Sequence, residues 1–313
     1  MLLKIRALLS GAATYIPGYR AMRATGGTDS ARYCYTVWLR HLTLANAGAP
    51  HLQVPHTVAE LGPGDSIGIG VAALLSGAEQ YYAFDVVAYP DLRRNLSIFG
   101  ELVELFRRRE PIPAEGEFAA LQPRVPDTCF PAALLDEQRM RAALDPGRIA
   151  AIRASLENPA VPGSRIVYRA PWTDDARIES ASVDHIFSQA VLEHVVDLPT
   201  VYGAMRRWLK PAGVMTHQID YRCHGKADNW NGHWSYSDLA WRIVVGRRPY
   251  LLNRLPHSAQ MALLRVGGFE LVRETRELDA SGITRASLAQ RFREMSEDDL
   301  VTCGAFVLAA PAP

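Results

Sequence analysis

The stretch that decides the fold is Val58-Ala59-Glu60-Leu61-Gly62-Pro63-Gly64-Asp65-Ser66-Ile67-Gly68, and a second apolar run after it stops at Phe84-Asp85. This order predicts a strand, a glycine turn, a helix, and a second strand that ends in an acid. Gly62 and Gly64 lack a Cβ, so their turn can be tight and the backbone can approach a ligand closely. Asp85 follows the turn by about 20 residues, where a carboxylate reaches ribose hydroxyl groups. We therefore expect a nucleotide-binding α/β sheet whose ligand is an adenosine derivative.

The spacing of the glycines narrows the class of adenosine derivative. A dinucleotide fingerprint that begins at Gly62 needs a glycine at position 67, where the sequence has Ile67, and this weakens a hydride-transfer interpretation. A phosphate-binding loop is excluded because no Gly-Lys-Ser/Thr follows the turn. Glu60 ends the first strand, where an acid repels a pyrophosphate but suits a cationic ligand or its amino group. The candidate ligand contacts in this unit are Glu60, Gly62, Pro63, Gly64, Asp85 and Val86.

Two further segments agree with this unit in order and spacing. Residues 182–195 read Ser-Val-Asp-His-Ile-Phe-Ser-Gln-Ala-Val-Leu-Glu-His-Val, and residues 208–214 read Trp-Leu-Lys-Pro-Ala-Gly-Val. Together with residues 60–64 they resemble the class I S-adenosylmethionine (SAM)-dependent methyltransferases. The resemblance covers residues 56–95 and 165–309. The sequence departs from the family pattern at Ser66 and Ala212, where the family has glycines, although a serine there is a reasonable N-cap for the helix.

The resemblance implies SAM as the cofactor and an α/β, Rossmann-like fold. Its sheet has seven mostly parallel strands with helices on both faces, the last strand antiparallel, plus a helical N-terminal cap and a helical insertion. The further cofactor contacts that it implies are Trp172, Ser188, Gln189, Ala190 and His194, with Asp174 as a shifted contact to the adenine amino group. Trp172 either stacks on the base or closes the core. His194, taken as opening the helix after the fourth strand, either caps that helix or contacts the cofactor or the acceptor.

The chain divides into parts of different character. Residues 1–50 predict a helical cap over the ligand-binding edge, and residues 51–313 predict the methyltransferase domain. The cap's polar and aromatic groups either reach the ligand or pack the cap against the core; they are Tyr33, Tyr35, Trp38, Arg40 and His41. An insertion at about 96–162 has helical periodicity at 101–109 and 131–156 around a proline-rich stretch. It is too long for a plain connection, so we expect a lid or a homodimer contact.

The composition indicates a soluble enzyme. The 313 residues are 48% hydrophobic and can bury a full core, and a net charge of +1 gives no electrostatic case for a nucleic acid partner. The four cysteines are scattered without a CxxC pair, which argues against a structural zinc or a disulfide framework and favours a reducing, cytoplasmic setting. No run reaches the roughly 20 apolar residues of a membrane span, so we expect no stable membrane insertion. The N-terminal residues read as an amphipathic helix, with loose membrane contact as the lesser alternative.

The most unusual composition lies between residues 217 and 236, at the start of a predicted acceptor-site loop at about 217–256. It concentrates imidazole, carboxylate, amide and indole groups where the fifth strand ends, and ligands of open α/β sheets lie beyond such ends. A hydroxyl acceptor gains from a base, and the hypothesis is His217 or His224 with Asp220 as the orienting partner. His233 is a further base. His217 with Asp220 and either His224 or His233 can form a ligand set for divalent iron, but their spacing in an irregular loop is not diagnostic and we assign no metal.

The sequence therefore predicts SAM-dependent methyl transfer to a small or saccharide-like acceptor, most simply at oxygen. Alternatives remain because cofactor motifs do not encode which carbon reacts. They are a SAM-dependent cyclisation or elimination, a non-catalytic SAM-binding module, and a nicotinamide-dependent oxidoreductase.

Overall fold

The computed structural model of the chain describes residues 2–18, 27–88, 91–114, 116–172 and 178–313. The expected adenine contact Asp174 lies outside these residues. Within them, none of the helices combines the length and the apolar character that a membrane span requires.

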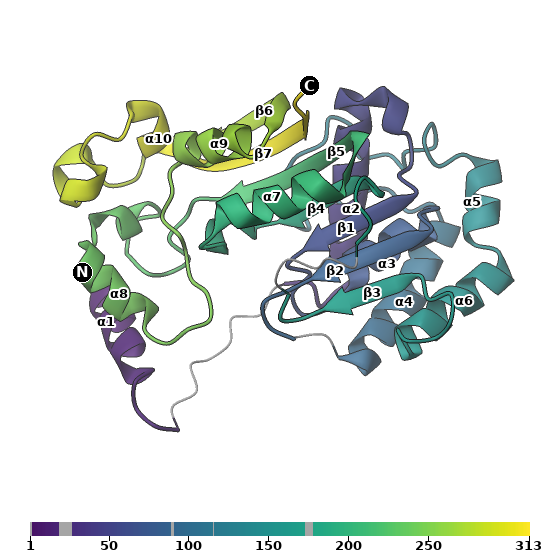
Figure 1. The fold of residues 1–313 in the computed structure, drawn as a ribbon, viewed down its shortest axis with the longest axis horizontal. Helices are drawn as coiled ribbons and strands as arrows, with labels where there is room; N and C mark the ends of the chain where they lie inside the picture. The colour runs from purple at the N-terminus through teal and green to yellow at the C-terminus, as the bar shows by residue number, and fades with distance from the viewer. Residues whose placement is uncertain (1, 19–26, 89–90, 115, 173–177) are drawn as a thin grey trace.

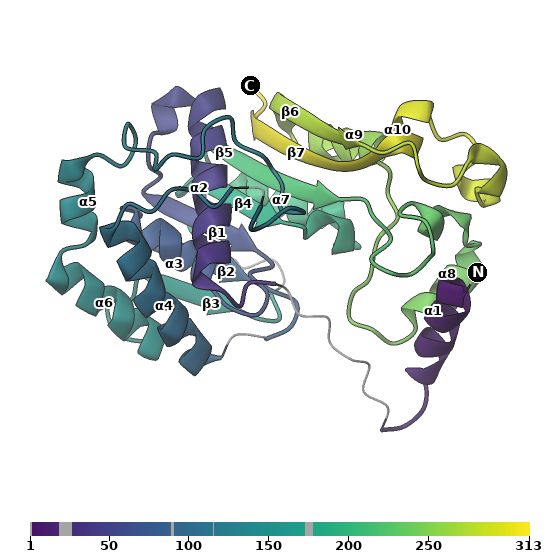
Figure 2. The same cartoon turned by 180° about the vertical axis from the view of Figure 1, so that it is seen from behind.

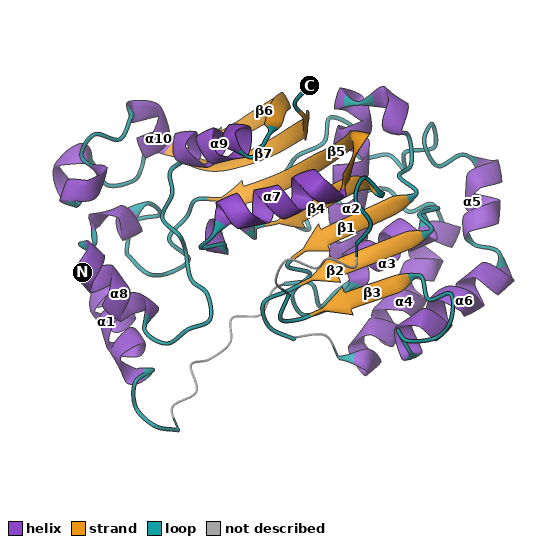
Figure 3. Ribbon diagram, in the orientation of Figure 1, coloured by secondary structure: helices purple, strands orange, loops and turns teal. Residues whose placement is uncertain are grey.

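Seven strands of the described chain form one sheet in the order β3-β2-β1-β4-β5-β7-β6 (Figure 3). Neighbouring strands are parallel except that β7 runs antiparallel to both β5 and β6, so the predicted α/β fold with an antiparallel last strand is confirmed. The order reverses between β1 and β4, and ligands of such sheets lie beyond the carboxyl ends of the strands at this point. The strands are β1 (Thr57–Leu61), β2 (Gln80–Phe84), β3 (Ile166–Arg169), β4 (Val183–Gln189), β5 (Leu209–Asp220), β6 (Phe269–Leu278) and β7 (Thr302–Pro311).

Helices cover both faces of the sheet, as the sequence predicts (Figures 1 and 2). On one face lie α2 (Ala31–Gly48), α3 (Gly68–Leu75), α4 (Leu92–Arg107) and α6 (Pro146–Glu157), and on the other lie α7 (Leu198–Trp208) and α9 (His257–Val266). Successive side chains of a strand point to opposite faces. Phe187 therefore packs under α2, with its ring 5.6 Å from that of Trp38, while Ile186 belongs to the core under α7. Burying a side chain such as Phe187 contributes roughly 1.5–3 kcal/mol.

The N-terminal segment does not form the single cap that the sequence predicts for residues 1–50. Its first helix, α1 (Leu2–Ala13), packs on α8 (Asp238–Val245) away from the sheet (Figures 1 and 2). The two helices approach so closely that a Cβ on Gly11 would lie 2.0 Å from the carbonyl oxygen of Ile243. In contrast, α2 lies against the sheet, and its Trp38 and His41 are fully buried. The interpretation of these side chains as core packing therefore fits the structure better than direct ligand contact.

The insertion is held against the core by a buried arginine. Its helices are α4, which begins before the predicted periodicity, α5 (Glu137–Ala143) and α6. Arg40 of α2 is 2% exposed and donates from Nη1 to the carbonyls of Leu121 (2.6 Å) and Pro123 (3.1 Å), and from Nη2 to that of Pro113 (3.1 Å). The proline-rich stretch has few amides to pair its own carbonyls, so the guanidinium satisfies them instead.

Short helical segments complete the chain. They are η1 (Pro50–Leu52), η2 (Leu192–His194), η3 (Gly232–Ser235), η4 (Arg285–Ser287), η5 (Gln290–Phe292) and α10 (Glu297–Val301). Side-chain caps fix several helix starts: Ser30 accepts from the Tyr33 amide at α2, Asp91 from the Arg94 amide at α4, and Asp197 from the Thr200 amide at α7.

We predict that Arg40→Met lowers the free energy of unfolding by about 3 kcal/mol, because buried carbonyls would lose their donor. Urea denaturation followed by circular dichroism measures this change. The matched control is Arg32→Met on the same helix, where the arginine pairs with Glu117 near the surface, and its expected cost is below about 1 kcal/mol. Equal costs for the two variants would show that Arg40 does not anchor the insertion.

Candidate functional site

The turn after β1 requires glycine for two reasons. Gly62 and Gly64 have φ values of 64° and 75°, in the left-handed region that disfavours side chains. A Cβ on Gly62 would also lie 2.6 Å from Cγ2 of Val191, which follows β4. The Gly62 amide donates to the carbonyl of Phe84 at 2.8 Å, so the turn is pinned to the end of β2.

Asp85, predicted from the sequence to bind ribose hydroxyl groups, lies beside this turn. Its Oδ1 accepts from the amides of Val86 (2.7 Å) and Val87 (3.2 Å), and its Oδ2 accepts from the amide of Gly64 at 3.4 Å. Burial raises the pKa of this carboxyl, and the three amides partly offset the rise. Val86 is 48% exposed beside it. A carboxylate next to an approachable backbone turn and an exposed apolar side chain is a surface that fits a nucleoside.

Glu60 lies behind the turn and is 2% exposed. Tyr81 Oη and the Gly70 amide donate to its carboxyl group, which therefore lies on the α3 side of the sheet. Burial raises the pKa of Glu60 to about 8. In this arrangement Glu60 supports the turn from behind, whereas the sequence predicted a side chain that faces the ligand.

Thr28 closes the turn from the N-terminal side, and the sequence analysis did not single it out. Its Oγ1 donates to the carbonyl of Pro63 at 2.8 Å and accepts from the amide of Ser66 at 3.1 Å. Ser66 Oγ donates in return to the Thr28 carbonyl and accepts from the Gly68 amide. The serine that replaces a family glycine thus joins the N-terminal segment to the turn. No local pattern around Thr28 indicates this contact.

Two of the three residues predicted to line the cofactor at the end of β4 turn inward. Ser188 is fully buried, and Gln189 bonds through Oε1 to His41 Nε2 (3.1 Å) and through Nε2 to the carbonyl of Gln122 (2.8 Å). Ala190 differs from them. It has a φ of 54° and donates its amide to the carbonyl of Gln218 at 2.8 Å, so the chain leaves the strand here in a left-handed conformation.

His217 lies inside β5 and not in a loop. Its side chain lies on the same face of the sheet as those of Met215 and Ile219, which α7 covers, and it is fully buried. Its Nδ1 lies 2.7 Å from Ser188 Oγ, and burial lowers its pKa to about 3. A fully buried, neutral imidazole does not reach an acceptor at the edge of the sheet, so the geometry does not support His217 as the base.

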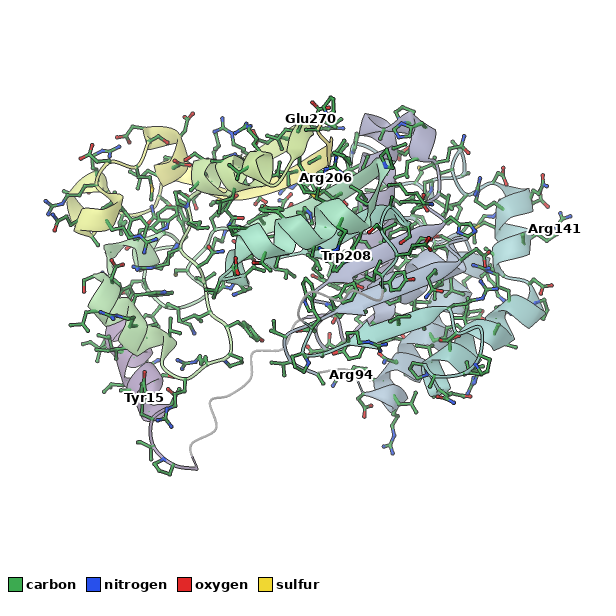
Figure 4. The ribbon with its side chains drawn as sticks, in the orientation of Figure 1. Tyr15, Arg94, Arg141, Arg206, Trp208 and Glu270 are labelled. Carbon is green, nitrogen blue, oxygen red and sulfur yellow. The ribbon has the colours of Figure 1, made fainter. Side chains whose placement is uncertain are left out.

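Trp172 closes the core at the end of β3. Its ring centroid lies 5.2 Å from that of Phe84 and 5.4 Å from that of Trp208. Figure 4 labels Trp208 at the end of α7, and Trp208 is fully buried. The Trp172 amide donates to the carbonyl of Asp85 at 3.0 Å. These contacts favour the core-closing interpretation of Trp172 over stacking on the base.

A cluster of imidazole and carboxyl groups, the edge cluster, lies beyond the ends of β4 and β5. His194 belongs to the short turn η2 and does not open the next helix, because α7 begins only at Leu198 behind its cap Asp197. Its ring centroid lies 5.1 Å from that of His224 and 5.7 Å from that of Tyr250. Burial, followed by the nearby charge of His224, lowers the pKa of His194 to about 4.

Glu193 completes this cluster, although the sequence analysis gave it no role. Its side chain is 2% exposed, and among the described residues neither carboxyl oxygen accepts a hydrogen bond of normal geometry, although the backbone amides of Glu193 and Asp220 lie near them. Burial raises the pKa of Glu193 well above its ordinary value.

His224 and Asp220 form the pair that the sequence predicts. Asp220 ends β5, and its Oδ2 lies 3.2 Å from Nε2 of His224. Arg222 donates to Oδ1 from its amide (2.9 Å) and from Nη1 (3.2 Å). Burial by itself would raise the pKa of Asp220, but His224 and Arg222 lower it overall. His224 is exposed and has a φ of 46°, a second left-handed residue at this edge.

His233 lies outside the cluster. It is 2% exposed, its ring centroid lies 4.8 Å from that of Trp234 and 6.4 Å from that of Trp241, and burial lowers its pKa to about 3. Of the predicted bases, the structure therefore gathers His224 and Asp220 at the edge and leaves His217 and His233 in the interior.

Residues 133–216 match the family model described as "Methyltransferase domain". This segment contains β3, β4, α7 and most of β5, while the glycine turn at the switch point lies outside it. Over this segment the chain is similar to that family's methyltransferase domain, and its sheet has the seven strands and the antiparallel last strand that the resemblance to class I SAM-dependent methyltransferases implies.

SAM is the cofactor that the resemblance implies, and the residues present are compatible with it. The Gly62 turn leaves its backbone approachable, and the Asp85 carboxyl lies beside this turn.

Several solved methyltransferase structures are similar to this chain. The chain is 14% identical to an S-adenosylmethionine dependent methyltransferase from Mesorhizobium loti, over 85% of this chain and 97% of that one, with a TM-score of 0.40. It is 13% identical to a putative sarcosine dimethylglycine methyltransferase from Galdieria sulphuraria, over 89% and 85%, with a TM-score of 0.44. It is 12% identical to phosphoethanolamine N-methyltransferase 2 of Haemonchus contortus, bound to SAM, over 98% and 57%, with a TM-score of 0.45. No curated protein matches the sequence. Similarities this weak decide nothing about the acceptor.

We predict that Glu60→Gln makes the protein more stable at high pH than the wild type. The folded-state pKa of Glu60 is about 8 and its ordinary value is 4.5, so ionisation favours the unfolded chain. Wild-type stability therefore falls as the pH rises from about 4.5 to about 8, and the glutamine removes this part of the fall. Urea denaturation at several pH values measures the difference between the two free energies of unfolding, which grows across this window and is constant outside it. Parallel pH profiles for the two proteins would contradict the assignment.

Proposed function

We propose that this methyltransferase methylates an oxygen atom of a small, hydroxylated, saccharide-like acceptor. The observation that carries the proposal is the pair His224–Asp220 beside His194 at the carboxyl edge of the sheet. A hydroxyl group is a poor nucleophile until it loses its proton, so a site for it needs groups that assist this loss. An amine acceptor has less need of them.

The cofactor is proposed to lie across the switch point between β1 and β4. Asp85 would bind the ribose hydroxyls and Val86 would flank the adenine, while the backbone of Gly62, Pro63 and Gly64 borders the rest of the nucleoside. SAM supplies a methyl group that is already activated on a sulfonium. Ala190 and His194, after β4, then lie toward the methyl end. Glu60, Ser188, Gln189 and Trp172 support this surface through buried contacts.

The reaction that we propose needs alignment and the loss of one proton. The acceptor oxygen forms the new bond to the methyl carbon as the bond from carbon to sulfur breaks, and the electron pair of that bond goes to sulfur. The hydroxyl proton leaves the acceptor. His224 assists this loss, and Asp220 orients its ring through Nε2. Holding oxygen, carbon and sulfur in line is the larger contribution of the protein.

The saccharide-like character of the acceptor is supported by the side chains around His224. Tyr250 and Trp230 are half-buried, and an aromatic face suits the apolar face of a sugar ring. Tyr250 borders His194, and the backbone of Trp230 accepts from the Cys223 amide at 2.6 Å, next to His224. Asn229 and Lys226 offer polar groups on the same loop.

We predict that Asp85→Ala weakens the binding of SAM by about tenfold or more, because a charged hydrogen-bond acceptor to the ribose is lost. Isothermal titration calorimetry with SAM measures the dissociation constant. The matched control is Asp91→Ala, which also removes an aspartate that accepts from a backbone amide but lies at the cap of α4. If SAM binds Asp85→Ala as tightly as it binds the control, the ribose assignment is wrong.

We predict that His224→Ala lowers turnover by roughly 100-fold while SAM affinity stays unchanged, because the group that assists proton loss is removed. Transfer of labelled methyl from SAM to a panel of monosaccharides and nucleotide sugars measures turnover, and mass spectrometry locates the methyl group. Amines of similar size are the contrasting acceptors.

The control for this variant is His51→Ala, which removes an exposed imidazole whose Nε2 lies 2.9 Å from the carbonyl of Ala212, far from the cluster. It should retain wild-type turnover. Faster methylation of amines than of hydroxyl acceptors, or full turnover by His224→Ala, would count against oxygen as the acceptor atom.

A further inference from the structure

Three side chains of the edge cluster have the arrangement of metal ligands. One ligand atom each from Glu193, His194 and His224 lies within 4.8 Å of the other two. Two atoms that bind one transition metal at about 2.1 Å are separated by roughly 3 to 4 Å. Small side-chain movements would therefore bring the three atoms to coordinating distance.

The unmet hydrogen-bonding capacity of the cluster is a second and independent observation. Glu193 is 2% exposed, and among the described residues neither of its oxygens accepts a hydrogen bond of normal geometry, although the backbone amides of Glu193 and Asp220 lie near them. Nδ1 of His194 also has no hydrogen-bond partner among these residues. A buried polar group without a partner is costly, and one that is ionised is more costly still. A cation between these atoms would compensate all of them at once.

The surroundings of His224 are those of a metal-binding histidine. Asp220 engages Nε2 at 3.2 Å, which fixes the ring and leaves Nδ1 for a metal. Arg222 in turn holds Asp220 through two hydrogen bonds to Oδ1. Histidines that bind metals commonly pair their other ring nitrogen with a carboxylate, which orients the ring and raises its basicity.

We propose that Glu193, His194 and His224 bind a divalent transition-metal cation such as Zn²⁺ or Co²⁺, whose remaining positions take oxygen atoms of the acceptor and of water. Two imidazoles and one carboxylate form a ligand set that such cations accept with positions left open. All three residues lie beyond the carboxyl ends of β4 and β5, where the proposed acceptor would bind. The inference rests on the proposed function only for the role of the cation and not for its binding.

The cation gives His224 a more specific part in methyl transfer. Coordination of the acceptor hydroxyl lowers its pKa, so the proton passes to solvent as the oxygen takes the methyl group. His224 then assists proton loss by holding the cation and does not take the proton itself. The ligand set that the sequence suggested combined His217 and Asp220 with His224 or His233. In the structure His217 and His233 are buried and do not belong to the group of ligand atoms within 4.8 Å, and Asp220 supports His224 from behind.

The decisive experiment measures metal binding directly. The chain without an affinity tag is freed of metals with a chelator, dialysed, and titrated with Co²⁺, whose visible absorption reports imidazole and carboxylate ligands, and with Zn²⁺ by calorimetry. We expect saturable binding at one site. His224→Asn and Glu193→Gln should each weaken it by about tenfold or more, and Asp220→Asn should weaken it by about tenfold because the ring loses its orienting carboxylate. His51→Asn, which removes an exposed imidazole elsewhere, should leave it unchanged.

Failure of this inference can be told apart from failure of the proposed function. If the wild type binds Co²⁺ and Zn²⁺ no better than His224→Asn does, the metal site is refuted, while methyl transfer to hydroxyl acceptors still stands or falls by its own assay. Methylation at the full rate in the presence of a chelator would also refute the role of the cation. Thermal unfolding of each variant checks that it is folded; should the buried Glu193→Gln fail this check, the exposed His224→Asn carries the test.

Discussion

The absence of a side chain at Gly62 is the constraint on which both the turn after β1 and the edge cluster after β4 depend. This residue adopts a left-handed conformation, donates to the end of β2, and leaves no room for a Cβ because Val191 fills the space. Three segments therefore meet at one residue: the end of β1, the end of β2 with Asp85, and the chain that leaves β4. Val191 comes two residues before Glu193. The contact between Gly62 and Val191 therefore shapes the turn after β1 and also positions the start of the edge cluster.

Polar groups in the core hold this edge in place from behind. His41 of α2 and His185 of β4 each lie 2.7 Å from the hydroxyl of Thr216 in β5, and His41 also bonds to Gln189. Burial lowers the pKa of His41 to about 4, so the network works with a neutral ring. These bonds favour a single arrangement, because alternatives break them, although Nδ1 of His185 has no hydrogen-bond partner among the described residues. The helix α2 is thereby part of the core that supports the site.

The edge cluster is arranged differently, because several of its groups are buried without being satisfied. Among the described residues, Glu193 and His194 have buried polar atoms without a hydrogen bond of normal geometry, and Ala190 and His224 adopt left-handed backbone conformations. Such features cost free energy, and the surrounding fold has to compensate for them. Buried polar atoms without hydrogen bonds also occur elsewhere among the described residues. What distinguishes this edge is that one ligand atom each of Glu193, His194 and His224 lies within 4.8 Å of the other two.

Local patterns in the sequence were sufficient for the framework. The apolar runs and the glycines at 62 and 64 predicted the first two strands and the turn between them, because strand period and turn conformation are properties of neighbouring residues. The seven-stranded sheet with its antiparallel last strand was what the resemblance to class I methyltransferases implied. The sequence also allowed the prediction that Asp85 lies near the glycine turn and that His224 lies near Asp220, because the carboxyl ends of parallel strands share one edge of the sheet.

Only the tertiary structure decided which polar side chains face that edge. His217 and Asp220 are three residues apart in one strand, yet α7 covers the first while the second lies at the strand's end. Glu193 is buried in the short turn η2, which precedes the start of α7 at Leu198. The burial of a side chain depends on elements that are distant in sequence, and no local pattern contains them.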